Sequence, residues 1–466
     1  MTSKIGSAER PTEPSERSVP ALLVLIVLLS LATYGAFSSS VPIMFVSALV
    51  GACVLPRNSL PPMALWLVVL LPVSVMTIPT PLSKYFSPAV LVIAIWAIRL
   101  AVGQRALLLR VPLRGWLIIP PLFLLLFVSA LGSGRTDLTM AWVAVLTLCV
   151  VAPAILGQIA TEDIWPGLLW AFAGIGIFLG LLSAAEFFLD FNPWASLIRY
   201  DISSQTWSTF RARASLGHPL TMSTAASVTL VACLFPGGDK RLWWQWAGAF
   251  GALVAVILSV SRSSVFAIGI AAVVGLFAVR ASSRAVAQGK RSRWGSLFLA
   301  GGLISVVAFS PLLARRSDSS EGLGSAEYRS DILRKALDLI TDHPLVGYGP
   351  GTSYVVYAQH YASSIRIGRL ENSVLQLIIS IGIPASLLSL IGLGIMIGIA
   401  LKRSRPGVAA GMVAFFVTIA GYNALDVNPA LLAFVAPLIY CAMMPITDVT
   451  ATANAYSLVH SSGRRS

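Results

Sequence analysis

The chain has 466 residues, of which 56% are hydrophobic and 11% charged, and its formal net charge is +14. Soluble domains carry about 25% charged residues, so this composition excludes an ordinary soluble protein. Apolar runs of roughly 15–29 residues recur along the chain, and a helix needs about 20 residues to cross a bilayer. The sequence therefore predicts an all-α, polytopic helical membrane protein with one dominant apolar block and no second folded domain.

The positive charge is concentrated in short loops between the apolar runs. Lys and Arg gather near residues 105–114, 240–241, 280–293, 402–405 and 464–465. Cytoplasmic loops of membrane proteins are enriched in these residues. Membrane orientation thus explains most of the excess charge, and no nucleic-acid partner is expected. If all of these clusters face the cytoplasm, both chain ends lie inside as well.

We expect about 12–14 membrane spans. In chain order they cover residues 20–37, 41–55, 63–79, 87–101, 115–131, 139–159, 165–189, 217–236, 242–260, 263–280, 294–312, 372–400, 407–423 and 429–445. The expected organisation is a cytoplasmic tail at 1–19, spans within 20–312, an extracytoplasmic loop at 313–371, further spans within 372–445 and a cytoplasmic tail at 446–466. The first span follows a polar tail without a small-residue cleavage site, which favours a retained span over a removed signal peptide.

The residues that usually hold metals or cofactors form no recognisable pattern. Cys53, Cys149, Cys233 and Cys441 lie inside apolar runs without paired spacing, which indicates core thiols. No His, Cys, Asp or Glu cluster has metal-ligand spacing. No dinucleotide fingerprint, phosphate-cradling Gly loop with lysine or Ser–His–acid arrangement occurs. We therefore expect neither a metal nor a cofactor.

Several arginines lie on the predicted outer face, where orientation does not call for positive charge. They are Arg211, Arg213, Arg262, Arg329, Arg366 and Arg369. Arg262 lies in a tight turn between two apolar runs, where the guanidinium and the following helix N-terminus would both favour a bound anion. Alternatively, Arg262 snorkels to lipid headgroups, and Arg211 and Arg213 lie in a solvated loop.

The long polar stretch before residue 372 contains an amphipathic helix followed by a tight turn. Ser325 can cap this helix, and His343-Pro344 ends it. The spacing predicts that one side carries Arg329, Leu333, Ala336, Leu337 and Ile340, with Arg334 and Lys335 pointing elsewhere. Residues 343–351 contain three glycines and two prolines, which is typical of a fixed backbone turn.

Glu371 and Asn372 stand where the long loop returns to the membrane. Asn372 can cap the next helix, in which Gly382 and Pro384 allow close packing and a kink. Glu371 is either a carboxylate at the helix start, paired with Arg369, or a general base.

Four pieces, taken in order, resemble the bacterial O-antigen ligase and polymerase family, membrane glycosyltransferases that act on lipid-linked sugars. The pieces are Arg211 to Pro219, Ser261-Arg262-Ser263, Arg329 to Leu333 with the turn at 343–351, and Glu371-Asn372 with Gly382 and Ala385 downstream. The resemblance covers roughly residues 211–401. One departure is that the family's usual histidine is Glu371 here, which leaves ligase and polymerase both open.

The resemblance implies a GT-C-like fold in the bacterial plasma (inner) membrane. It also implies transfer of a glycan from undecaprenyl diphosphate to the hydroxyl of a glycan or lipid acceptor on the outer face, in contact with membrane lipid and without a metal. The expected catalytic residues are Arg262, Arg329 and Glu371. The expected substrate-binding residues are Arg211, Arg213, Arg366, Arg369 and Asn372.

Two other functions fit the same composition. A transporter or flippase of lipid-linked oligosaccharides would also be polytopic and would also meet a diphosphate with cations. Against it, the predicted charges cluster at the outer surface rather than near the midplane, and the sequence shows no two-fold repeat. A catalytically silent relative that serves as an assembly partner is the third possibility.

Overall fold

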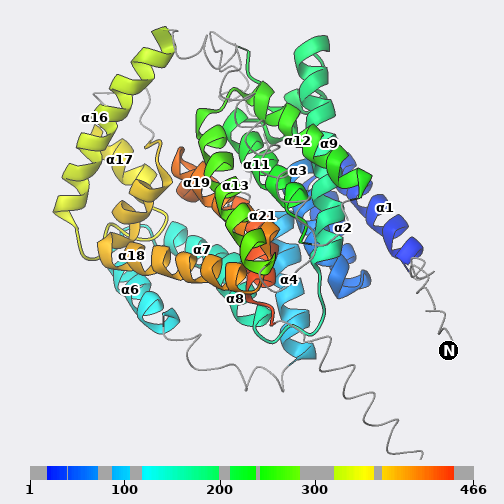
Figure 1. Ribbon diagram of the computed structural model, residues 1–466. Coiled ribbons are helices and arrows are strands. Elements are labelled where there is room, and N and C mark those ends of the chain that lie inside the picture. The colour runs from blue at the N-terminus through cyan, green and yellow to red at the C-terminus, as the bar shows by residue number, and fades with distance from the viewer. Residues whose placement is uncertain are drawn as a thin grey trace, which may run out of the picture.

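The computed structural model describes residues 18–38, 40–71, 85, 87–104, 118–198, 210–237, 242–283, 320–361 and 370–445. Within these ranges the chain is helical and forms no sheet, as the sequence predicts (Figure 1). The α-helices are α1 (Ser18–Phe37), α2 (Val41–Val54), α3 (Leu60–Leu70), α4 (Pro88–Gly103), α6 (Ile119–Leu131), α7 (Thr136–Leu146), α8 (Ala152–Gly157), α9 (Trp165–Leu189), α11 (Pro219–Leu234), α12 (Trp243–Ser259), α13 (Arg262–Ser283), α16 (Ser320–Asp342), α17 (Ser353–Tyr361), α18 (Ser373–Lys402), α19 (Pro406–Ala420), α20 (Ala424–Val427) and α21 (Leu432–Met443).

The helices follow the predicted membrane spans closely. Five described helical segments are long and apolar enough to cross a membrane, and seven shorter apolar helices accompany them. Each of these twelve segments coincides with a predicted span. Helix α3 covers the first part of the span predicted at 63–79, and the span predicted at 294–312 lies outside the described residues. The prediction of a polytopic helical membrane protein is confirmed.

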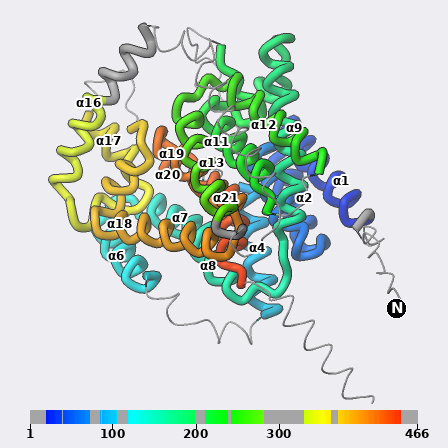
Figure 2. Tube along the Cα trace, in the orientation of Figure 1, coloured from blue at the N-terminus to red at the C-terminus, as the bar shows by residue number. Residues whose placement is uncertain are grey.

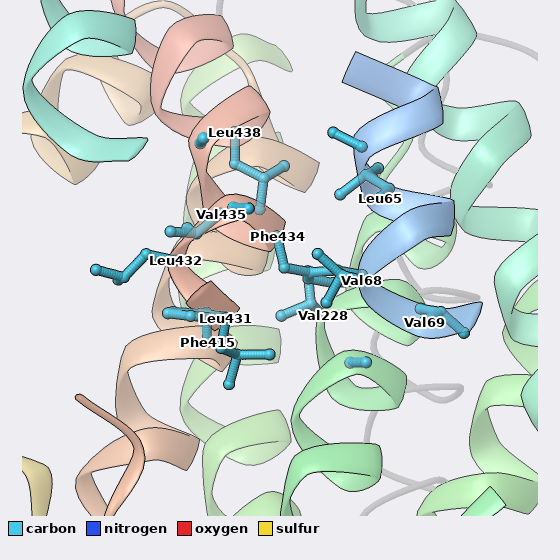
Figure 3. Close-up of a cluster of buried hydrophobic side chains, with 14 of the residues drawn as sticks. Leu65, Val68, Val69, Val228, Phe415, Leu431, Leu432, Phe434, Val435 and Leu438 are labelled. Carbon is cyan, nitrogen blue, oxygen red and sulfur yellow. The ribbon is translucent and has the colours of Figure 1, made fainter. Parts of the chain in front are cut away.

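The core is formed by helices that are far apart in the sequence. Figure 3 shows Leu65 and Val68 of α3 facing Phe434 of α21, with Val228 of α11 and Phe415 of α19 nearby. These side chains are buried, and close van der Waals packing of this kind holds membrane helices together. The core therefore joins the N-terminal spans to the C-terminal ones.

Helices α9 and α12 approach so closely that only glycine fits between them. A Cβ atom added to Gly176 would lie 2.9 Å from the carbonyl carbon of Gly248, and one added to Gly180 would lie 2.6 Å from the Cα of Gly251. Small residues at helix interfaces are a common way to pack helices in lipid, where no hydrophobic effect drives them together. This contact fixes α9 against the helix that leads into Arg262.

Loops that the charge pattern predicts on one side of the membrane contact one another. At what we call the predicted inner end, Arg405 pairs with Asp163 at 3.5 Å. The Trp165 Nε1–H donates to the Pro236 carbonyl at 2.7 Å, and an Arg403 Nη1–H donates to the Met444 carbonyl at 2.6 Å. The loops before α9, before α19, after α11 and after α21 therefore lie together.

The opposite end, which we call the predicted outer end, gathers the remaining loops. The Trp194 Nε1–H donates to the Leu70 carbonyl at 3.0 Å, and the Trp142 Nε1–H donates to the Leu425 carbonyl at 3.2 Å. Every loop that carries a described candidate residue lies at this end. Which end faces the cytoplasm remains a prediction.

Helix α16 differs from its prediction in both start and buried face. It begins at Ser320, so Ser325 lies inside the helix rather than at its cap, although the helix does end before His343. The buried residues are Ile332, Ala336, Leu339 and Ile340, whereas Leu333 and Leu337 are 47% and 50% exposed. The predicted buried side was therefore wrong by about one residue position. The reason is that packing against α17 and α18, and not the local spacing of apolar residues, selects the side that is buried.

Helix α16 and α17 form a small second core at one side of the bundle (Figure 1). Ile332 and Ala336 pack there with Tyr357 of α17 and Ile379 of α18. Arg329 lies on the same helix, three residues before Ile332. The Arg329 side chain itself lies outside the described part of the chain.

Lys335 does not point away from this unit, contrary to the prediction. Its Nζ pairs with Asp331 at 2.9 Å and lies 5.3 Å from the ring centre of Tyr361 on α17. Arg334 is exposed, as predicted. Of the two basic residues, only Arg334 is therefore free of a role in docking α16 on α17.

The glycine-rich turn at 343–351 is fixed, as predicted. Gly347 and Gly349 have φ angles of +66° and +114°, a region that favours glycine. The turn fits into a kink of α18 at Gly382, whose φ is +76°. The Tyr348 N–H donates to the Ile379 carbonyl at 2.9 Å, and the Ile383 N–H donates to the Pro344 carbonyl at 2.8 Å. Backbone groups released by the kink are thus satisfied by the turn.

Candidate active site

Arg211 is a buried cation at the predicted outer end. Its side chain is 6% exposed, and its Nε–H donates to the Ser259 carbonyl at 3.1 Å. The next residue, Ala212, donates its N–H to the Leu258 carbonyl at 2.9 Å. The segment around Arg211 is thereby tied to the end of α12, three residues before Arg262. The alternative of a solvated loop does not describe Arg211.

Arg213 is half-buried beside Glu186 of α9. The Glu186 Oε2 accepts hydrogen bonds from the backbone N–H groups of Arg213 at 2.9 Å and Ala214 at 2.8 Å. Burial lowers the pKa of the Arg213 guanidinium, and the nearby Glu186 carboxylate opposes this shift. An arginine remains protonated under these conditions, so Arg213 adds a second partly desolvated positive charge next to Arg211.

Arg262 is the first residue of α13, and its side chain is exposed. The serines on either side of Arg262 form a buried cluster of hydroxyl groups. The Ser264 O–H donates to Ser223 Oγ of α11 at 2.6 Å, and the Ser261 and Ser264 hydroxyls are bonded at 3.0 Å. The backbone turns sharply just before Arg262, where Val260 has a φ of +50°. The structure thus gives Arg262 a rigid base and an accessible guanidinium.

The start of α18 meets the start of α13 through the turn that follows α19. The Ser263 side chain packs against Gly421, where an added Cβ would lie 2.7 Å from Ser263 Cβ. The Tyr422 carbonyl accepts a hydrogen bond from Ser373 Oγ at 2.7 Å, and its hydroxyl bonds to Thr224 of α11 at 3.0 Å. The first turns of α11, α13 and α18 are therefore joined.

Asn372 caps α18, as predicted. Its Oδ1 accepts hydrogen bonds from the N–H groups of Val374 at 2.9 Å and Leu375 at 3.0 Å. Glu371, one residue earlier, is half-exposed, and no hydrogen bond or ion pair joins its carboxylate to any residue that the structure describes. Arg369 lies outside the described residues, so the predicted pair with Glu371 stays a prediction.

The eight candidates thus fall into three sets. The structure brings five of them to the predicted outer end: Arg211, Arg213, Arg262, Glu371 and Asn372. Arg329 lies on α16, which packs against the first half of α18. Arg366 and Arg369 lie outside the described residues. In the described ranges, no three His, Cys, Asp or Glu side chains gather where a metal ion could be held.

Two buried hydroxyl groups of α11 that the sequence did not single out link these helices: Ser223 bonds to Ser264 of α13, and Thr224 bonds to Tyr422. Thr221, Ser227 and Thr229 of the same helix are also buried. Their signal was visible as a run of small polar residues in an otherwise apolar span, where such side chains often join helices. His218 caps α11 by accepting a hydrogen bond from the Leu220 N–H at 3.2 Å.

The groups at this end of the bundle can bind an anion and accept a proton. Guanidinium groups stabilise a diphosphate, and the start of α13 adds its own positive end. A half-exposed carboxylate nearby can accept a proton. The helical spans and this polar end together are those of a polytopic helical membrane protein.

Residues 247–390 match the family described as O-antigen ligase. No curated protein matches the chain. The matched segment runs from α12 into α18 and includes Arg262, Arg329 and Glu371, whereas Arg211 and Arg213 precede it. The predicted resemblance to the O-antigen ligase and polymerase family is confirmed, and with it glycan transfer of the O-antigen ligase type in general.

Proposed function

We propose that the protein transfers or polymerises a glycan from undecaprenyl diphosphate onto an acceptor hydroxyl at the outer face of the plasma membrane. The observation that carries the proposal is the junction of α11, α13 and α18, which gathers Arg211, Arg262 and Glu371 at one end of the bundle. The extracytoplasmic loop at 313–371 would cover the sugar, with spans on either side and both tails in the cytoplasm.

In this mechanism the acceptor hydroxyl oxygen forms a bond to the anomeric carbon of the donor. The bond from that carbon to the diphosphate oxygen breaks, and its electron pair stays on the diphosphate. Arg262 and Arg329 stabilise the growing negative charge more in the transition state than in the ground state. Glu371 takes the proton of the acceptor hydroxyl. Arg211, Arg213, Arg366 and Arg369 hold the diphosphate or glycan.

Arginine suits this role because its planar guanidinium makes bidentate contacts with phosphate oxygens. Fixed guanidinium groups supply the charge stabilisation that a divalent cation supplies in other phosphate-handling enzymes. The proposed reaction therefore needs no metal and no cofactor. Its energy comes from the activated diphosphate–sugar bond, so it needs no nucleotide either.

The test is transfer by the purified protein with a synthetic undecaprenyl-diphosphate-linked glycan and a hydroxyl-bearing acceptor, in the presence of a chelator. We expect a glycosylated acceptor or an elongated glycan, together with free undecaprenyl diphosphate. A ligase needs the second glycan acceptor, whereas a polymerase extends the donor alone. Movement of the intact donor across a vesicle membrane without product would instead favour the transporter, and binding without either would favour the silent partner.

A further inference from the structure

A short segment after α19 is bonded along one side of the first half of α18. The Ser373 Oγ accepts hydrogen bonds from the N–H groups of Ala424 at 2.9 Å and Leu425 at 3.3 Å. One turn further, Gln376 Oε1 accepts from the Asp426 N–H at 3.4 Å. Ser373 and Gln376 lie at i and i+3 and therefore share a face. Helix α20 thus runs along the part of α18 that begins directly after Glu371.

Asp426 of α20 is a fully buried carboxylate with a side chain that is 0% exposed. Its Oδ2 accepts a hydrogen bond from the Ser380 hydroxyl of α18 at 2.8 Å. The same oxygen accepts from the backbone N–H of Ser353, at the start of α17, at 3.1 Å, and from the Ser353 hydroxyl. Ser353 and Ser380 also contact each other, since the Ser353 N–H lies 3.1 Å from Ser380 Oγ. One carboxylate oxygen therefore joins α17, α18 and α20. Figure 2 shows where these three helices lie along the Cα trace.

The position of this junction decides what it holds in place. Ser353 follows the glycine-rich turn at 343–351, and Ser380 lies two residues before the kink at Gly382. The Gly349 N–H of the turn donates to the Ser380 carbonyl at 2.8 Å. The turn is therefore bonded directly to the residue of α18 that donates to Asp426. The second core formed by α16, α17 and the first half of α18 includes Ile379, the neighbour of Ser380, and Val356, three residues after Ser353.

A buried carboxylate is costly unless donors surround it, and bonds to an ionised acceptor are about twice as strong as neutral ones. Apolar packing alone could attach α17 to α18 at lower cost. A carboxylate with three donors instead fixes distance and direction, which is the property a reactive site needs from its supporting residues.

We propose that Asp426 is a positioning residue that holds the glycine-rich turn and α17 on the first half of α18, and thereby sets the place of α16 with Arg329 relative to Glu371. This inference rests on the proposed function for its catalytic consequence. Its geometric part, the fixed placement of α16, does not depend on which reaction the protein performs. Asp426 itself makes no contact with substrate in this scheme.

The first measurement compares Asp426→Asn and Ser380→Ala with Ser389→Ala in steady-state transfer. Ser389 is the matched control, because within the described residues its hydroxyl bonds to the Ala385 carbonyl of its own helix and not to another helix. We expect kcat of the Asp426→Asn protein to fall on the order of 10²-fold, as for other small misplacements of reacting groups, with KM for the donor and the yield of folded protein little changed. Ser380→Ala should lose part of kcat, and Ser389→Ala should match the wild type.

The second measurement needs no activity. Spin labels are placed on Arg334→Cys of α16 and Leu189→Cys at the outer end of α9, both exposed, in a Cys53→Ser background that removes the exposed native thiol. We expect one narrow distance distribution in the parent protein and a broadened or shifted one after Asp426→Asn. Ser380→Ala should shift it in the same direction, and Ser389→Ala should leave it unchanged.

The two measurements also separate this inference from the proposed function. A narrow, unshifted distribution in both the Asp426 and Ser380 variants would overturn the positioning role, whatever the activity. If Asp426→Asn does not fold, Ser380→Ala alone decides, because it leaves the two Ser353 contacts with Asp426 in place. A loss of kcat that only follows the loss of folded protein would show a purely structural role. No transfer by the wild type, with a broadened distribution in the variants, would reject the proposed function and keep the inference.

Discussion

At the scale of single residues, Arg262 is the position where a positive charge can be removed with the least effect on packing. Its guanidinium is exposed, while its backbone rests on the bonded serines Ser261 and Ser264. Arg262→Ala should therefore lower transfer about 10²–10³-fold, the usual cost of removing one oxyanion donor, without lowering the yield of folded protein. Arg262→Lys should recover little of it, because a point charge cannot make the bidentate contact. The measurement is kcat at saturating donor.

Arg334 of α16 provides the control for Arg262. It is an exposed arginine with no place in the α16–α17 contact, so Arg334→Ala should leave transfer within about twofold, as expected for a surface substitution. An equal loss in the Arg334 and Arg262 variants would contradict the assignment, since it would mean that general surface charge, not a placed guanidinium, matters.

Glu371 supplies the second test at this scale. Glu371→Gln keeps the shape of the side chain but cannot accept a proton, so turnover should fall about 10²–10⁴-fold, the usual contribution of a general base. Donor binding should persist, and Glu371→His should restore part of the rate because imidazole is also a base. Near-normal transfer by a folded Glu371→Gln protein would reduce Glu371 to a helix-start carboxylate, with the cap supplied by Asn372 alone.

At the scale of elements, the docking of the glycine-rich turn into the α18 kink is open to a direct test. Gly382 has a φ of +76°, and an added Cβ would lie 2.5 Å from the carbonyl carbon of Leu345. Gly382→Ala combines backbone strain of about 1–3 kcal/mol with an overpacking cost of similar size. We expect a lower melting temperature and a loss of transfer.

Gly394 on the same helix is the matched control. A Cβ added there meets nothing within 4 Å, and the residue has no unusual φ. Gly394→Ala should leave stability equal or raise it by about 0.5–1 kcal/mol, because alanine favours the helix. Thermal unfolding in detergent compares the two variants. Equal melting temperatures would mean that the turn does not lock onto the kink.

The elements also show how far the sequence alone could reach. Spans, the Asn372 cap, the fixed turn and the kink at Gly382 all follow from local rules, namely apolar length, side-chain capping and the special backbone of glycine and proline. The buried face of α16 does not, because Ile332 and Leu339 are buried only where α17 and α18 happen to lie. The same holds for Asp426 and Ser380, which are 46 residues apart in the chain and meet only in the folded protein.

The candidate site was predictable to the same degree. Arg211, Arg262 and Glu371 stood out as ionisable residues in unusual places beside apolar spans. The hydroxyl groups of Ser223, Ser264 and Tyr422, which join the helix starts, gave a weaker signal. A hydroxyl in an apolar span most often bonds to its own helix backbone, and only the packing shows which ones bridge two helices.

At the scale of the whole molecule, the grouping of loops into two ends predicts the topology. Reporters fused after Gly289 and after Arg403 should indicate the cytoplasm, and one fused after Ser320 should indicate the outer face. The reason is that Arg403 and Arg405 lie in the contacts of the predicted inner end, and positively charged loops stay inside. A cytoplasmic signal at Ser320 would place the arginine-rich end on the wrong side for the proposed reaction.

The most direct test of glycan transfer at the outer end uses sealed vesicles with one known orientation. Lipid-linked donor is present in the membrane, and a membrane-impermeant hydroxyl acceptor is added outside. Vesicles that expose the face carrying Arg262 and Glu371 should glycosylate the acceptor without permeabilisation and with a chelator present, whereas inverted vesicles should do so only after permeabilisation. Equal product from both orientations, or product only from sealed inverted vesicles, would contradict transfer at the outer end.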